Sequence, residues 1–199
     1  MPLLDQLRAA PNLFTLLRLF MLPFLVIAIL DGQYRIAFGL FVLAGLSDAV
    51  DGILARWLNQ QTTLGQYLDP IADKLLLSTL FVTLTYIGLI PRYVTVLVFC
   101  RDISILLIAT LLFAISILRS FRPSLFGKLN TVVQVITVTS VLLAQVVSSS
   151  ALTTLNEILI RLVAVVAPVS AAEYGYIILK RVSAYEAETA AHKHDTSSS

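Results

Sequence analysis

Residues 12–30 read NLFTLLRLFMLPFLVIAIL, an apolar stretch with one charged side chain, Arg18, that ends at the turn pair Asp31-Gly32. A helix needs about 20 residues of this kind to cross the ~30 Å hydrocarbon core of a bilayer. No small-residue cleavage site follows the stretch, so we expect a permanent helix and not a signal peptide. The stretch therefore predicts a transmembrane helix.

Similar apolar stretches follow along the rest of the chain. We expect further spans at Tyr34–Leu58, Asp69–Ile90, Tyr93–Leu118, Leu129–Val147 and Leu152–Leu179. The composition agrees, because 58% of the 199 residues are hydrophobic and 13% are charged, against about 25% charged in soluble domains. The mean hydropathy is +0.89. These values exclude an ordinary cytosolic globule and predict an all-α, polytopic membrane protein, a bundle of six transmembrane helices.

The distribution of positive charge predicts the orientation of this bundle. If the N-terminus is cytoplasmic, that side of the membrane collects Arg8, Arg56, Arg119, Arg122, Lys128, Lys180 and Arg181. Because cytoplasmic loops are enriched in Lys and Arg, we expect both termini in the cytoplasm. Residues 1–182 would form a single membrane domain, and residues 183–199 a disordered cytoplasmic tail. The net charge of +2 is not typical of a nucleic-acid-binding protein.

Charged side chains interrupt the predicted spans at a few positions, namely Asp48, Asp51, Arg56, Asp69, Asp73, Lys74, Arg101 and Asp102. A charge at the bilayer centre costs about 2.5–3.5 kcal/mol, and several buried charges do not by themselves stabilise a bundle. A single Asp paired with Arg101 or Lys74 would be a structural feature. The whole set favours a functional site inside the bundle.

The aspartates have helical spacing. Asp48 and Asp51 are at positions i and i+3, and Asp69 and Asp73 are at i and i+4, so each pair lies on one face of its helix. Carboxylates crowded into a low-dielectric cavity repel one another unless divalent cations bind them. Because no Cys or His is nearby, the oxygen ligands favour a hard ion such as Mg²⁺ or Mn²⁺.

Residues 48–73 read DAVDGILARWLNQQTTLGQYLDPIAD and match the pattern D-x2-D-G-x2-A-R-x8-G-x3-D-x3-D at every fixed position. This pattern is the signature of the CDP-alcohol phosphatidyltransferase family, which the chain resembles. Pro11-Asn12-Leu13 with Thr15 and Arg18 is similar to the opening helix of the family. Gly127–Thr131 with Gln134 is similar to the start of its fifth helix, so the resemblance covers most of residues 11–180.

The resemblance implies a six-helix membrane enzyme that forms a homodimer and has its active site on the cytoplasmic side. Asp48, Asp51, Asp69 and Asp73 would bind two divalent cations, Mg²⁺ or Mn²⁺, that hold the diphosphate of CDP-diacylglycerol. Asp73 would also be the catalytic base that takes the proton of the acceptor hydroxyl. The cytidine diphosphate pocket would be lined by Gly52, Ala55, Arg56 and Gly65.

The resemblance leaves two acceptor alcohols open. Arg101 and Lys128 correspond to basic positions that members using glycerol 3-phosphate, the phosphatidylglycerophosphate synthases, use for the acceptor phosphate. Asp102 and Asn130 stand where those members usually carry Glu and Lys, which favours phosphatidylglycerol, the acceptor of eukaryotic-type cardiolipin synthases.

The length of the N-terminal segment favours the first acceptor. Only about ten residues precede the opening motif, too few for an organelle-targeting sequence, so we expect a protein of the bacterial inner membrane. Bacterial members with a glycerol acceptor most often use glycerol 3-phosphate, which we take as the first hypothesis, with phosphatidylglycerol as the alternative.

A function of a different class is an ion-coupled transporter that uses the same intramembrane carboxylates. Inverted-repeat transporters have interrupted helices in two matching halves, and this sequence shows no such pair. Its acidic residues also concentrate in one motif and do not form a relay across the membrane. Both observations disfavour transport.

Overall fold

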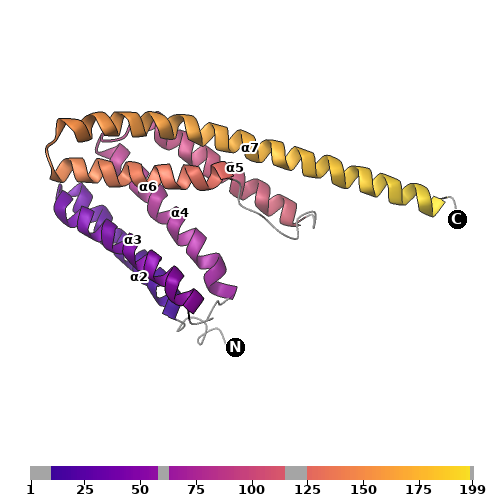
Figure 1. Ribbon diagram of the computed structural model, residues 1–199, viewed down its shortest axis with the longest axis horizontal. Helices are drawn as coiled ribbons and strands as arrows, with labels where there is room; N and C mark the ends of the chain where they lie inside the picture. Colours follow the sequence, from indigo (N-terminus) through magenta and orange to yellow (C-terminus); the bar gives the residue numbers. More distant parts are fainter. Residues whose placement is uncertain (1–9, 58–62, 115–124, 198–199) are drawn as a thin grey trace.

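The computed structural model describes residues 10–57, 63–114 and 125–197 of the chain, and these residues form six helices (Figure 1). The helices are α2 (Ala10–Leu30), α3 (Tyr34–Trp57), α4 (Thr63–Tyr86), α5 (Arg92–Ala114), α6 (Leu125–Val146) and α7 (Ser150–Ser197). The predicted all-α class and number of helices are confirmed. Most predicted boundaries lie within a few residues of the observed ends.

Two of the turns between helices depend on a glycine in the left-handed region. Gly32, which follows α2, has φ 71°, and Gly88, which follows α4, has φ 81°. At each turn a backbone N–H just beyond the glycine closes on the preceding helix, from Gln33 to Ala28 at 2.8 Å and from Leu89 to Leu84 at 2.9 Å. These bonds satisfy the last carbonyls of the helix, and glycine adopts this φ without steric cost.

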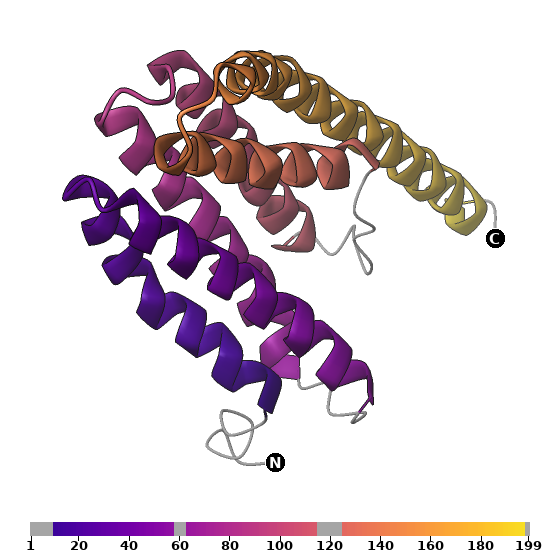
Figure 2. The ribbon, with the colours of Figure 1, turned by 60° about the vertical axis from the view of Figure 1, so that its left-hand side comes forward.

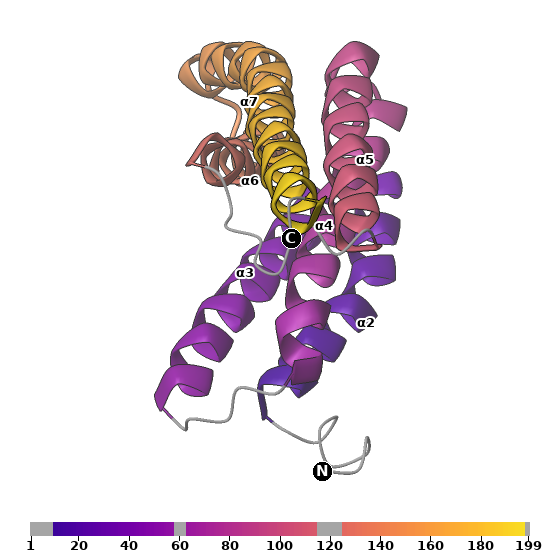
Figure 3. The same ribbon diagram turned by 90° about the vertical axis from the view of Figure 1, so that its right-hand side faces the viewer.

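The helices form two groups that meet along the bundle. α2 packs on α3 and α4, while α6 packs on α7, and α5 packs on α7 and α4. Figures 1 and 2 show α6 and α7 as an antiparallel pair. In Figure 1 the helices converge at the end that carries the α2–α3 and α6–α7 turns, and they spread apart toward the opposite end. Figure 3 shows the same spread viewed along α7. Contacts of α6 with α3 and α4 join the two groups.

Polar side chains lie inside the bundle, while large apolar side chains cover its outside. The core contains Leu25, Ile29, Leu80, Phe81, Leu84, Val98, Val138 and Leu142. Buried among the helices are also Thr15, Arg18, Arg101, Asn130, Gln134, Thr137 and Ser170. On the outside, Phe20 is 67% exposed and Leu106 is 65% exposed. This distribution is typical of a surface that faces lipid, because ionisable and amide groups in membrane bundles face the interior.

Two helical segments of the described residues are long and apolar enough to cross a membrane. They are Phe126–Val146, within α6, and Ser150–Lys180, within α7. Thr15–Leu30 and Tyr34–Ser47 are shorter apolar helices. Together with the apolar exterior, these segments indicate a membrane protein.

The structure differs from the sequence prediction at two boundaries. α7 continues to Ser197, where the sequence predicted a disordered tail from Ser183. Residues 184–191, AYEAETAA, are rich in Ala and Glu, which are strong helix formers and extend the preceding helix. α4 begins at Thr63 and not at Asp69. The sequence prediction followed hydropathy and began the span at Asp69, but the helix starts in the more polar residues before it, and Pro70 lies inside α4, as membrane helices tolerate.

Candidate active site

An ion pair between α2 and α4 is the centre of the candidate site. Nη1 of Arg18 donates to Oδ1 of Asp73. The Arg18 side chain is 2% exposed, whereas that of Asp73 is 43% exposed. A buried cation therefore holds a carboxylate that solvent or a ligand can still reach. Truncating one member of such a pair leaves the other charge uncompensated, so the two residues are coupled.

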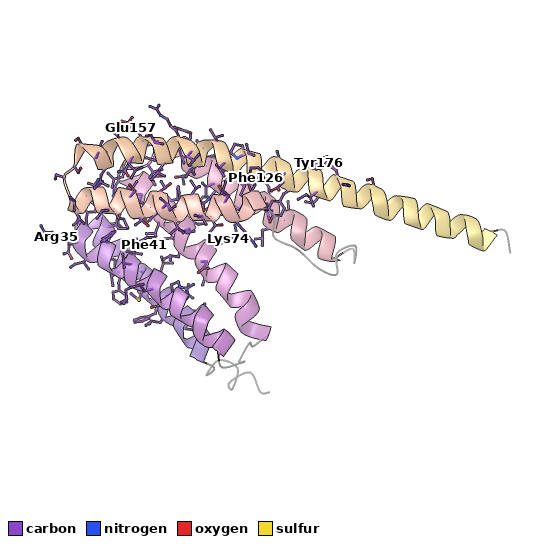
Figure 4. The ribbon with its side chains drawn as sticks, in the orientation of Figure 1. Arg35, Phe41, Lys74, Phe126, Glu157 and Tyr176 are labelled. Atoms are coloured by element: carbon purple, nitrogen blue, oxygen red, sulfur yellow. The ribbon has the colours of Figure 1, made fainter. Side chains whose placement is uncertain are left out.

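A cavity of about 250 Å³ lies beside this ion pair. Four helices contribute its walls: Arg18 from α2, Asp73 from α4, and otherwise Phe41, Ala44, Gly45, Leu76, Leu77, Thr131 and Val135. Figure 4 shows Phe41 and Lys74 further along the bundle than Arg35, which lies at the end with the α2–α3 turn. The cavity thus combines one charged pair with apolar walls, as ligand sites commonly do.

The helix register relates this cavity to the other motif aspartates. Asp48 follows Ala44 and Gly45 at the next turn of α3, and Asp69 precedes Asp73 by one turn of α4. Because α3 ends and α4 begins at the same end of the bundle, both steps lead away from the α2–α3 turn. The helix positions are therefore compatible with a site that extends from the cavity to the remaining carboxylates.

Several predicted site residues lie outside the part of the chain with described side chains, namely Asp48, Asp51, Gly52, Ala55, Arg56, Gly65 and Asp69. Their helices place the first five on α3 and the last two on α4. Among the described side chains, no three His, Cys, Asp or Glu residues come together as a metal site. That search reached Asp73 alone of the four predicted ligands, so the metal site stays a prediction.

A second group of charges joins α4, α5 and α7. Asp102 accepts hydrogen bonds from Nζ of Lys74 at 2.5 Å and from Nη1 of Arg101 at 2.6 Å. The other nitrogens of Arg101, Nε and Nη2, donate to Oγ of Ser170 at 3.3 and 3.0 Å. The guanidinium also lies 5.8 Å from the ring centroid of Tyr174. Arg101 thus holds α5 against α7.

The two predicted acceptor-phosphate residues have different surroundings. Arg101 is 6% exposed and has a protein partner for each of its three nitrogens. Lys128 is exposed in the first turns of α6. The prediction that both bind the acceptor phosphate stays a prediction.

Arg18, Asn130 and Gln134 are the residues whose contribution sequence reasoning missed. In the sequence these residues carry the family resemblance, and Asn130 also bears on the choice of acceptor, but none of the three is predicted to be buried; Asn130 is 1% exposed and Gln134 3% exposed. One signal was present, since each is a polar residue inside an apolar stretch. The partner of Asp73 was not predictable from the sequence, because Lys74 and Arg101 are also basic and lie nearer to Asp73 along the chain than Arg18 does.

The CDP-alcohol phosphatidyltransferase family model matches residues 8–172. Cardiolipin synthase (CMP-forming) of Rattus norvegicus is 38% identical over 154 residues, which cover 68% of this chain and 50% of that protein. A probable phosphatidylglycerophosphate synthase of Mycobacterium tuberculosis is 35% identical over 134 residues, covering 64% and 62%.

A third relative is the CDP-diacylglycerol–glycerol-3-phosphate 3-phosphatidyltransferase of Bacillus subtilis, 30% identical over 148 residues that cover 67% of this chain and 76% of that protein. The chain spans about half the length of the cardiolipin synthases of rat and human that it matches. The family model covers more than half of the chain and includes the aspartate motif, Arg18 and the start of α6. The chain therefore belongs to the CDP-alcohol phosphatidyltransferase family.

Proposed function

We propose that the protein transfers a phosphatidyl group from CDP-diacylglycerol to a glycerol-type alcohol and releases CMP. The observation that carries this proposal is the position of Asp73, the last aspartate of the family motif. Its accessible carboxylate is bonded to the buried Arg18 at the wall of a cavity inside the bundle. Membership of the family supports the same reaction class.

The transfer forms one bond and breaks another at phosphorus. The primary hydroxyl of the acceptor attacks the phosphorus that carries the diacylglycerol, and the bond from that phosphorus to CMP breaks. The hydroxyl loses its proton as it attacks, and Asp73 is the group that we propose to receive it. Arg18 restricts the orientation of the carboxylate, so that its position is set before the acceptor binds.

Asp48, Asp51, Asp69 and Asp73 would hold two divalent cations, since carboxylate oxygens are the ligands that Mg²⁺ and Mn²⁺ prefer. Metal bound there would supply positive charge to the diphosphate and to the departing CMP. Gly52, Ala55 and Gly65 are small positions that would let CDP approach the backbone. Arg56 would donate hydrogen bonds to its phosphate oxygens.

For the acceptor we now favour phosphatidylglycerol. Arg18 is already bonded to Asp73, and both Arg101 and Lys74 are bonded to Asp102. A glycerol 3-phosphate dianion in the interior would need these basic side chains as partners and would have to compete for them with Asp73 and Asp102. The headgroup of phosphatidylglycerol ends in a neutral glycerol, and its single phosphate charge would remain near the membrane surface, where Lys128 is exposed. Relatives named cardiolipin synthase support this choice.

Glycerol 3-phosphate, the first hypothesis from the sequence, remains the second candidate. Relatives of Mycobacterium tuberculosis and Bacillus subtilis whose names specify glycerophosphate chemistry support it. In this case Arg101 and Lys128 would bind the acceptor phosphate, and Arg101 would exchange its bonds to Ser170 for bonds to that phosphate.

The remaining parts of the proposal concern the membrane. We propose that the six helices span a bacterial inner membrane, with both termini and the active site on the cytoplasmic side. We also propose that the protein forms a homodimer. The apolar exterior and the Lys and Arg distribution support the orientation.

The experiment that tests the reaction measures CMP release by the purified protein from CDP-diacylglycerol with Mg²⁺ or Mn²⁺. Phosphatidylglycerol and glycerol 3-phosphate are offered in separate reactions, and mass spectrometry identifies the lipid product. Cardiolipin formation supports the favoured acceptor, whereas phosphatidylglycerophosphate formation selects the second candidate. Absence of CMP release with both acceptors, next to an active relative, contradicts the proposal.

A further inference from the structure

Two buried amides on α6 have hydrogen-bonding groups that the protein does not use. Asn130 and Gln134 lie one turn apart and are 1% and 3% exposed. Within the described part of the chain, neither amide atom of Asn130 has a hydrogen-bond partner, and neither does Nε2 of Gln134. Leaving such a group unpaired away from water destabilises a folded protein. Three unpaired atoms on one face of a helix therefore indicate a ligand that pairs with them.

Other buried polar side chains of α6 are paired, so the unpaired amides are a local feature. Oγ1 of Thr137 donates to the carbonyl oxygen of Val133 at 2.7 Å, and Oγ of Ser140 donates to Oδ1 of Asn156 at 2.6 Å. Both lie further along α6, toward the α6–α7 turn. The unpaired groups occur at the opposite part of the helix.

The position of the amides relates them to the candidate active site. Thr131 and Val135 line the same cavity as Asp73. Asn130 directly precedes Thr131 in the sequence, and Gln134 directly precedes Val135. The amides are therefore at the same level of α6 as the carboxylate and the ion pair with Arg18. They belong to the adjoining, fully buried strip of the helix surface.

The chemistry of the unpaired atoms restricts the ligand. An amide offers a donor and an acceptor and carries no charge, which matches a hydroxyl group. A phosphate has no proton to offer Oδ1 of Asn130 when it is fully ionised, and it would be buried there without a cation. Phosphatidylglycerol and glycerol 3-phosphate share a secondary hydroxyl on the carbon next to the attacking primary hydroxyl.

We propose that the side chains of Asn130 and Gln134 bind the secondary hydroxyl of the acceptor glycerol and so select a glycerol-type alcohol. The inference rests on the proposed function, and it holds for either acceptor. Binding of the secondary hydroxyl on α6 restricts the rotation of the neighbouring carbon and turns the primary hydroxyl toward Asp73. The two amides are thus specificity-determining residues.

The test compares each acceptor with an analogue that lacks only the secondary hydroxyl. The pairs are phosphatidylglycerol with phosphatidyl-1,3-propanediol, and glycerol 3-phosphate with 3-hydroxypropyl phosphate. The kcat/KM ratio within the productive pair is measured for the wild type, Asn130→Leu and Gln134→Met, which preserve side-chain volume. Thr137→Val is the matched control, because its buried hydroxyl on the same helix already has a partner.

We expect the wild type to prefer the acceptor with the secondary hydroxyl by roughly 10- to 100-fold, as sites built to bind a hydroxyl do. In Asn130→Leu the preference falls to within about threefold of unity, while KM for CDP-diacylglycerol and the ratio in Thr137→Val stay unchanged. Gln134→Met lowers the preference in the same direction.

Two results overturn the inference, and a third rejects the proposed function on which it rests. The first is a wild type that uses both members of the pair equally well. This result rejects the inference without any variant, so it does not depend on whether the variants fold. Folded variants that keep the wild-type ratio also reject it. A wild type that releases no CMP with any acceptor rejects the proposed function itself, which distinguishes the two failures.

Discussion

Arg18 and Asp73 form an ion pair across the bundle although 55 positions separate them in the chain. The pair joins α2 to α4 and connects the opening helix of the family with the last aspartate of its motif. A neighbouring side chain that holds a functional group usually sets its orientation, and the neighbour of Asp73 is almost fully buried. The carboxylate is thus positioned by a residue outside the motif.

Asp73→Asn should lower kcat for CMP release by about 10²- to 10⁴-fold, which is the usual contribution of a general base. The amide has a similar shape but cannot take the hydroxyl proton. The measurement is steady-state CMP release at saturating CDP-diacylglycerol. Asp31→Asn, at the exposed α2–α3 turn, is the control and should retain full activity. CMP release by Asp73→Asn at the wild-type rate would remove Asp73 from the base role.

Arg18→Gln should lower kcat by roughly 10- to 100-fold, because a charge-assisted hydrogen bond worth about 1.5–3 kcal/mol is lost at the carboxylate. KM for the acceptor should change less than kcat, since Arg18 acts through Asp73. The control is Arg35→Gln, an exposed arginine at the other end of the bundle. If Arg18→Gln keeps the wild-type kcat, the ion pair has no part in positioning the carboxylate.

Asp102→Asn should destabilise the bundle, because it leaves the buried guanidinium of Arg101 without its anion. Breaking one side of a buried pair typically costs about 3–5 kcal/mol, which a thermal unfolding scan in detergent would detect as a large decrease in Tm. Glu157→Gln disrupts the exposed Glu157–Arg161 pair of α7 and should leave Tm unchanged. Equal effects of the two substitutions would show that the α4–α5–α7 charge group does not hold the helices together.

Gly32→Ala should lower Tm, since Gly32 has φ 71° and an alanine there costs about 1–2 kcal/mol. Gly39→Ala is the matched comparison within α3, where an added Cβ meets no atom within 4 Å. That change should leave Tm unchanged or raise it slightly, because Ala favours helix. A Gly32→Ala protein as stable as Gly39→Ala would contradict the assignment of strain to this turn.

Removal of divalent cations by EDTA should abolish CMP release, and addition of Mg²⁺ or Mn²⁺ should restore it. The physical reason is that the proposed site would bring four carboxylates and a diphosphate together at low dielectric, where they would need positive charge between them. Activity is followed before chelation, after dialysis and after metal is returned, with circular dichroism as the control for folding. Full activity after dialysis against EDTA would exclude the two-cation site.

The spacing of the aspartate motif could be predicted from the sequence, whereas the ion-pair partner of its last aspartate could not. The spacing of Asp69 and Asp73 depends on local helix geometry, which a sequence displays directly. The pairing of Asp73 with Arg18, by contrast, depends on how α2 packs against α4, and Lys74 and Arg101 were equally plausible partners by charge. The sequence also allowed a single Asp to pair with Arg101 or Lys74, and in the structure Asp102 is bonded to both.

Hydropathy alone predicted the all-α fold and indicated a membrane protein, because an apolar segment of about 20 residues satisfies its backbone in lipid as a helix. The motif spacing alone determined the family. Only the tertiary structure decided that Arg18 pairs with Asp73 and that Asp102 accepts hydrogen bonds from both Lys74 and Arg101. It also decided that the amide of Asn130 and Nε2 of Gln134 are buried with no hydrogen-bond partner among the described residues. These outcomes depend on how each helix is rotated in the bundle and on contacts between residues far apart in the chain. The periodicity of apolar and polar residues in the sequence specifies neither.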